Sequence, residues 1–168
     1  AGMIVGTVSM TGLGIKFSNL IGALAGGREL LGLFFTMLAC LVLGMALPTT
    51  ANYIVQASIT APALVSLGIP LLTAHLFVFY FGVFADITPP VALAAYAAAG
   101  IAKADPMKAG FIASRNVTVA YLIPYLFVYF PALLGNAPVF QVIESFITAA
   151  LAVVALSAAF SNYLLRSC

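Results

Sequence analysis

One segment of the chain combines a proline with hydroxyl and amide side chains inside a long apolar stretch. Thr49, Thr50 and Asn52 directly follow Pro48. Hydroxyl and amide oxygens, together with the carbonyls that a proline leaves without a backbone partner, are hard ligands suited to Na⁺ or to the water shell of a carboxylate. Half-helix ends on either side of such a break would add partial charges. The alternative is a tight turn whose hydroxyl groups cap the next helix.

A second segment repeats this combination further along the chain. Thr88 precedes the adjacent prolines Pro89 and Pro90, which remove two backbone amide donors. Membrane transporters build substrate and ion sites from pairs of discontinuous helices. The pairing therefore favours a binding site over two unrelated turns, and the three threonines of the two segments are the candidate Na⁺ ligands.

Two ionisable side chains lie near these segments. Asp86 is the only acidic residue between Glu29 and Asp105, and a carboxylate inside a membrane segment is a functional candidate because its burial is costly. The alternative is a solvated turn residue beside an aqueous vestibule. His75 is the only histidine and has no nearby cysteine, so we expect a hydrogen-bonded packing residue and not a metal ligand.

The composition indicates that both segments belong to a membrane protein. Of 168 residues, 64% are hydrophobic and 6% are charged, whereas soluble domains are about 25% charged. The apolar runs are continuous instead of alternating, which excludes a transmembrane barrel. We therefore expect an all-α, polytopic membrane protein surrounded by a lipid bilayer. The net charge of +2, without a dense basic patch, gives no reason to expect a nucleic-acid partner.

The lengths of the apolar blocks predict their roles. Residues 15–27 form an amphipathic connector. The two halves of 30–67 are each about 17 residues, or roughly 25 Å of helix, and end to end they would exceed a ~30 Å hydrocarbon core. We expect a re-entrant helical hairpin there, with a kink at Pro62. Residues 71–102 have the length of one tilted transmembrane helix with a broken centre. Only length separates these two roles, and they could be exchanged.

The remaining blocks predict the orientation in the membrane. The basic residues between Lys103 and Arg115 place that loop in the cytoplasm. Transmembrane helices at 109–134 and 139–165 would then cross out and back, with Arg166 on the cytoplasmic side. A hairpin at 30–67 would open from the external face.

The first residue and the two cysteines give two further expectations. The chain begins at Ala1 within an apolar run, without a positively charged segment before it, so we expect a piece of a longer protein. Cys40 and Cys168 imply no disulfide framework, and we expect reduced thiols.

Three long motifs in order resemble the large permease subunit of TRAP transporters. They are GMALPTTANYIV at 44–55, AHLFVFYFG at 74–82 and ITPPVALAAYAAAGIA at 87–102. The likeness extends from about residue 2 to residue 134. It is closest to the fused form, in which small and large membrane subunits share one chain and work with TAXI-type binding proteins.

The resemblance implies a function. Such proteins are ion-coupled secondary transporters of the elevator type, not enzymes, in the bacterial or archaeal cytoplasmic membrane. They take an organic acid from an extracytoplasmic substrate-binding protein and drive its uptake with a Na⁺ gradient, with no cofactor besides this coupling ion. A further partner is the N-terminal remainder of the same permease, including its small-subunit portion.

The resemblance also implies a domain organisation and a site. Residues 1–135 would be the second of two inverted repeats, and 136–168 an extra transmembrane helix. One Na⁺ site and half of the substrate site would lie at the hairpin tip and in the unwound stretch of the broken helix, formed by Gly44, Pro48, Thr49, Thr50, Thr88, Pro89 and Pro90. Asp86 falls where the resemblance implies no fixed acid.

Two other functions fit the same residues without the resemblance. One is an elevator carrier for dicarboxylate or citrate-like anions that works without a binding protein. The other is a membrane scaffold that transports nothing, in which the breaks are packing kinks.

Overall fold

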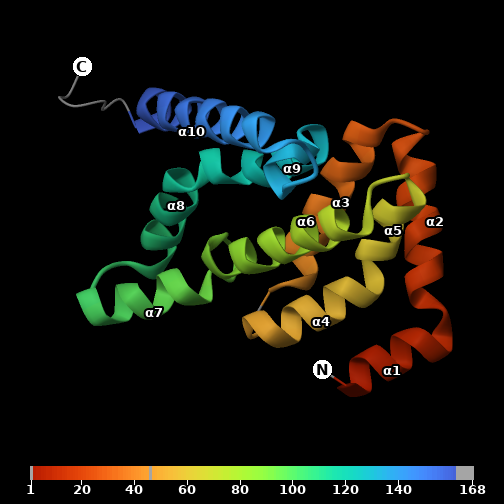
Figure 1. The fold of residues 1–168 in the computed structure, drawn as a ribbon. Coiled ribbons are helices and arrows are strands. Elements are labelled where there is room, and N and C mark those ends of the chain that lie inside the picture. Colours follow the sequence, from red (N-terminus) through yellow and green to blue (C-terminus); the bar gives the residue numbers. More distant parts are fainter. Residues whose placement is uncertain (1, 46, 162–168) are drawn as a thin grey trace. The chain divides into compact units, whose positions relative to one another are not determined.

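Every regular element that the computed structural model describes, over residues 2–45 and 47–161, is a helix (Figure 1). The expected all-α class is therefore confirmed. The expectations for Ala1, Arg166 and Cys168 lie outside the described residues, as does Ala46 of the hairpin. The chain forms two compact units that divide after Ser114, and each is described by itself. The expected boundary at residue 135 concerned sequence repeats and stays a prediction.

The first unit contains most of the helices. They are α1 (Gly2–Thr11), α2 (Leu13–Ala25), α3 (Glu29–Leu43), α4 (Thr49–Ile59), α5 (Ala61–Ser66), α6 (Leu71–Phe84), the 3₁₀ turn η1 (Ala85–Ile87), α7 (Leu93–Ala102) and the beginning of α8 (Pro106–Asn116). Left-handed glycines join α1 to α2 at Gly12 and end α2 at Gly26, where other residues would be strained.

Helices α3 and α4 form a hairpin. Gln56 on α4 binds the carbonyl of Cys40 on α3, and Gly44 lies against Asn52, so the two helices run antiparallel from a fold at Pro48. The second arm is itself interrupted, since α4 ends at Ile59 and α5 begins at Ala61. Pro62, where a kink was predicted, lies in the first turn of α5, directly after this interruption.

Helix α6 forms the centre of this unit. It packs against α3, α4 and α5, and Phe77 and Phe81 on α6 are fully buried with Leu33 of α3 and Leu64 of α5. The two phenylalanine rings pack against one another with their centroids 4.9 Å apart. This core joins the hairpin to the first half of the broken helix.

The break between α6 and α7 includes two consecutive prolines. The helix ends in η1, and no regular helix resumes until Leu93. Neither proline can donate a backbone hydrogen bond, which accounts for the loss of helix. Ala92, the last residue before α7, has a φ of 28° and is fully buried. This region of the Ramachandran plot is costly for alanine.

The segment over residues 109–134, which begins before the division after Ser114, is not one continuous helix. We predicted a single transmembrane helix over 109–134. The segment instead contains α8, the 3₁₀ helix η2 (Thr118–Leu122), α9 (Ile123–Tyr129) and the 3₁₀ helix η3 (Pro131–Leu134). Pro124 and Pro131 each lie in the first turn of a new piece, because a proline lacks the amide that a continuous helix requires.

The last described helix is the clearest candidate for a membrane span. Helix α10 (Val139–Ser161) is long and apolar enough over Val139–Phe160. Helix α8 taken together with Thr118–Tyr129 passes the same test. The apolar helices α2, α3 and α7 have 10–17 residues, fewer than the ~20 that a straight span needs.

Candidate functional site

The two breaks of the first unit meet. Gly44 is buried at the end of α3, and a β-carbon built on it would lie 2.6 Å from the β-carbon of Ala85. Ala85 opens η1 at the start of the second break. The same added atom would lie 2.7 Å from Nδ2 of Asn52. The tip of the hairpin and the end of α6 are therefore in direct contact, and only a residue without a side chain fits between them.

A fully buried pair of side-chain amides lies beside this contact, and we call Asn52 and Gln56 the amide pair. Asn52 Nδ2 donates to the carbonyl oxygen of Gly82 at 2.8 Å. Gln56 Nε2 donates to the carbonyl oxygen of Cys40 at 2.9 Å and to Oδ1 of Asn52. Both residues have no exposed surface. The amide pair thus connects α4 to α3 on one side and to α6 on the other.

Hydroxyl and thiol groups extend these bonds along the hairpin. Thr60 Oγ1 donates to the carbonyl oxygen of Gln56 at 2.8 Å, and the thiol of Cys40 donates to Thr60 Oγ1 at 3.5 Å. Among the described residues, two buried side-chain oxygens have no partner, Oε1 of Gln56 and Oγ1 of Thr36. A buried carboxamide oxygen without a partner is costly. Its lone pairs are those that water or a hard cation such as Na⁺ uses.

The residues predicted at the hairpin tip lie in two different environments. Pro48, Thr49 and Thr50 are exposed, whereas Gly44 and Asn52 are buried. The structure therefore brings the buried glycine and asparagine to the second break, and leaves both threonine side chains at the surface of the described chain.

The residues predicted at the second break are mostly half-buried. This holds for Asp86, Thr88 and Pro89, while Pro90 is exposed. Thr88 Oγ1 donates to the carbonyl oxygen of Phe84 at 2.6 Å. That bond to a residue four positions earlier satisfies a carbonyl of the last turn of α6.

Gln56 was not among the site residues predicted from the sequence. Asn52, Gln56 and Thr60 recur every four residues, and such residues lie on one face of a helix. Three polar side chains on one face of this short helix and its C-terminal cap would have been the signal for the buried polar face.

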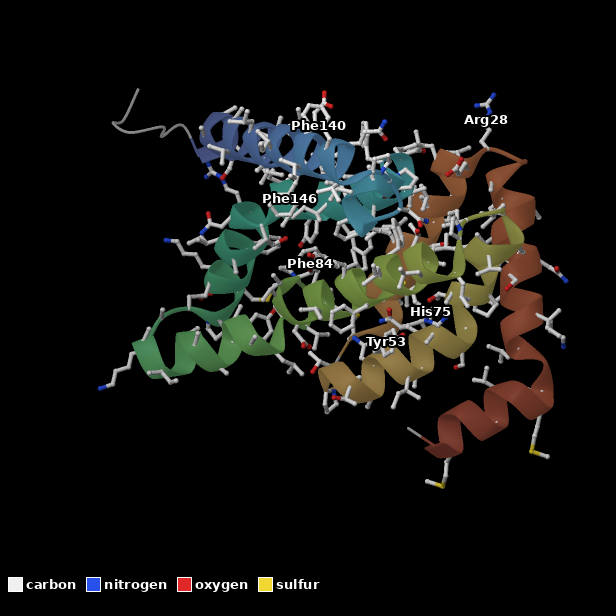
Figure 2. All side chains as sticks on the ribbon, viewed as in Figure 1. Arg28, Tyr53, His75, Phe84, Phe140 and Phe146 are labelled. Atoms are coloured by element: carbon white, nitrogen blue, oxygen red, sulfur yellow. The ribbon has the colours of Figure 1, made fainter. Side chains whose placement is uncertain are left out.

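A polar and aromatic pair also joins α4 to α6. The hydroxyl of Tyr53 lies 3.0 Å from Nδ1 of His75, and Figure 2 shows the two side chains on neighbouring helices. The Tyr53 ring also packs edge to face against the Phe79 ring, with the ring centroids 5.7 Å apart. This confirms that His75 is a hydrogen-bonded packing residue. Within the described residues, no three of His, Cys, Asp and Glu are grouped as a metal site.

We expect Tyr53→Phe to lower the thermal stability of the complete transporter modestly. The variant keeps the ring contact with Phe79 but loses the hydrogen bond to His75, and a bond of this kind contributes about 0.5–1.5 kcal/mol. Thermal unfolding in detergent would measure the change. Tyr53→Leu, which also removes the ring, should lower the melting temperature further, and equal melting temperatures for the two variants would contradict this account.

A folded-back helical hairpin in contact with a broken helix, with polar groups buried where the breaks meet, is typical of membrane transporters. Residues 1–142 match the family described as the DctM component of the tripartite ATP-independent periplasmic transporters, and the chain belongs to this family. No curated protein and no solved structure matches the chain significantly.

Membership of this family confirms the coarser expectations from the sequence. The chain is a component of a secondary transporter permease, located in a membrane, and is not an enzyme. The family works with a substrate-binding protein and a small membrane component. The fused form and the TAXI-type partner stay predictions.

Proposed function

We propose that this chain carries one Na⁺ site and half of the substrate site of a permease that takes up organic acids. The observation that supports the proposal is the contact between the two breaks, where Gly44 lies against Ala85 beside the buried amide pair. Two discontinuities in contact bring several helix ends into a small volume. Transporters of this kind bind their ions and substrates at such places.

The chemistry of the donors fits Na⁺. The hairpin tip offers the hydroxyls of Thr49 and Thr50, the second break offers that of Thr88, and the prolines in both segments remove backbone amide donors beside main-chain carbonyl oxygens. All of these are hard oxygen ligands. In this proposal the amide pair positions the backbone of the site, and the unpaired Oε1 of Gln56 is available to a water or to the ion itself.

The internal bonds support an elevator mechanism. In such a mechanism, the part that binds substrate must move as one body. Asn52 binds the carbonyl of Gly82 on α6, and Gln56 binds that of Cys40 on α3. These bonds tie both arms of the hairpin and the first half of the broken helix together, so we propose that the three helices move as one body in the inner membrane.

Uptake into proteoliposomes would test this function. The complete transporter that contains this chain would be supplied with radiolabelled organic acids, with and without a Na⁺ gradient and with and without its substrate-binding protein. We expect uptake only when both are present. Uptake that needs Na⁺ alone would instead support a carrier independent of a binding protein, and no uptake of any acid would support the scaffold.

We expect Thr49→Val and Thr88→Val each to raise the Na⁺ concentration for half-maximal uptake by about ten-fold. Each removes one oxygen ligand and keeps the shape of the side chain, and a ten-fold change corresponds to a loss of ~1.4 kcal/mol in affinity. Thr11→Val is the matched control, because the Thr11 hydroxyl binds a carbonyl within its own helix, away from both breaks. An unchanged Na⁺ dependence in both variants would disprove the assignment of these ligands.

A further inference from the structure

We propose that Tyr96 on α7 is a positioning residue that holds the backbone of the second break, and that Gly110 on α8 makes room for its ring. The inference rests on the proposed function, because it takes the second break to be part of the binding site. It assigns a role to two residues outside both breaks.

Tyr96 binds the segment 90–92 at two points. Its hydroxyl donates to the carbonyl oxygen of Pro90 at 2.6 Å, and its backbone amide donates to the carbonyl oxygen of Ala92 at 3.0 Å. The sulfur of Met107 is a second acceptor, 3.1 Å from the same hydroxyl. A tyrosine has one hydroxyl proton, and a carbonyl oxygen is a stronger acceptor than a thioether, so the bond to Pro90 dominates.

The backbone of this segment needs a hydrogen-bond donor from outside it. Pro89 and Pro90 have no backbone amide, so this stretch can form fewer internal backbone hydrogen bonds than a helix. Within the segment, the amide of Ala92 donates to the carbonyl oxygen of Thr88 at 3.3 Å. Ala92 itself has a φ of 28° and is fully buried. Such a conformation persists only where the surroundings hold it, and the Tyr96 side chain supplies a donor that the backbone lacks.

Gly110 on α8 packs closely against the Tyr96 ring and the second break. It is buried, and a β-carbon built on it would lie 3.0 Å from Cε1 of Tyr96, 3.4 Å from Cβ of Ala92 and 3.6 Å from Cγ of Pro89. Helix α8 therefore approaches the ring and the break closely through a residue with no side chain. The packing of α8 holds the Tyr96 ring in place, and the hydroxyl of that ring holds the carbonyl of Pro90.

Tyr96→Phe tests the inference in the complete, purified transporter. The variant keeps the ring and loses only the hydroxyl. We expect hydrogen exchange at the amides of residues 91–96 to become about ten-fold faster, with exchange in α6 and α10 unchanged. We expect the Na⁺ concentration for half-maximal uptake to rise several-fold at nearly the same maximal rate, because binding must now order the segment.

Gly110→Ala provides a second, independent test. Its methyl group would displace the ring and should have the same two effects with the hydroxyl still present. Gly100→Ala on α7 is the control, since a β-carbon there has no atom within 4 Å, and neither quantity should rise.

The outcomes separate this inference from the proposed function. Exchange in 91–96 that stays at the wild-type rate in both variants, or that rises evenly over the whole chain, would overturn the positioning role. Faster exchange with unchanged Na⁺ dependence would overturn its part in binding. A wild-type transporter that needs no Na⁺ for uptake would instead disprove the proposed function, and the exchange measurement would still decide the role of Tyr96.

Discussion

Gly44→Ala is expected to abolish uptake and to lower the melting temperature of the complete transporter. The added methyl carbon would lie 2.6 Å from Cβ of Ala85, 2.7 Å from Nδ2 of Asn52 and 2.9 Å from the carbonyl oxygen of Cys40. Two of these three neighbours are backbone or backbone-bound atoms, so the hairpin tip must move away from α6. Overpacking of this kind costs ~1–3 kcal/mol, and the movement would separate the two breaks.

Gly100→Ala is the matched control for this experiment as well. It makes the same change in a helix, at a position with open space, and alanine favours a helix over glycine by about 1 kcal/mol. Uptake assays and thermal unfolding of both variants side by side would measure the difference. Normal uptake by the Gly44 variant would show that contact between the breaks is not required for transport.

Asn52→Leu is expected to have the second large effect, because it breaks the amide pair. The carbonyl oxygen of Gly82 loses its side-chain donor, and Nε2 of Gln56 loses one of its two acceptors. Removing one partner of a buried hydrogen bond costs about 1–3 kcal/mol. We expect a lower melting temperature and faster hydrogen exchange in α4 than in the wild type.

An exposed asparagine provides the comparison for this variant. Asn19 lies on the surface of α2, so Asn19→Leu should leave the melting temperature and the exchange of α4 nearly unchanged. Equal effects of the two substitutions would mean that the buried bonds of Asn52 do not hold the hairpin to α6.

The interruptions of the helices were largely predictable, because their causes are local. A proline lacks an amide whatever its surroundings, and Pro62, Pro89 and Pro90 therefore marked irregular backbone in advance. The same rule applies at Pro124 and Pro131, where the expected helix over 109–134 is not continuous but divided into several pieces.

The composition of the candidate site was much less predictable, because burial depends on neighbours that are distant in sequence. Gln56 resembles any polar residue of a helix until α3 and α6 enclose it. The local sequence does not distinguish Gly44 from Gly100, and only the family resemblance singled out Gly44, yet Gly44 faces a crowded contact and Gly100 faces open space. The hydroxyl of Tyr96 likewise gains its role from the carbonyl of Pro90, which no periodic pattern places beside it.

The bonds of the amide pair to the neighbouring helices constrain the donor residues more than the acceptor residues. Asn52 and Gln56 donate from their side chains, but the groups that accept on α6 and α3 are the main-chain carbonyls of Gly82 and Cys40. Every residue type has such a carbonyl. These bonds therefore require no particular side chain at position 40 or 82, although the Cys40 thiol has its own bond to Thr60 and Gly82 lies close to the amide pair. Selection for these contacts therefore acts on the two amides and leaves their acceptors comparatively free.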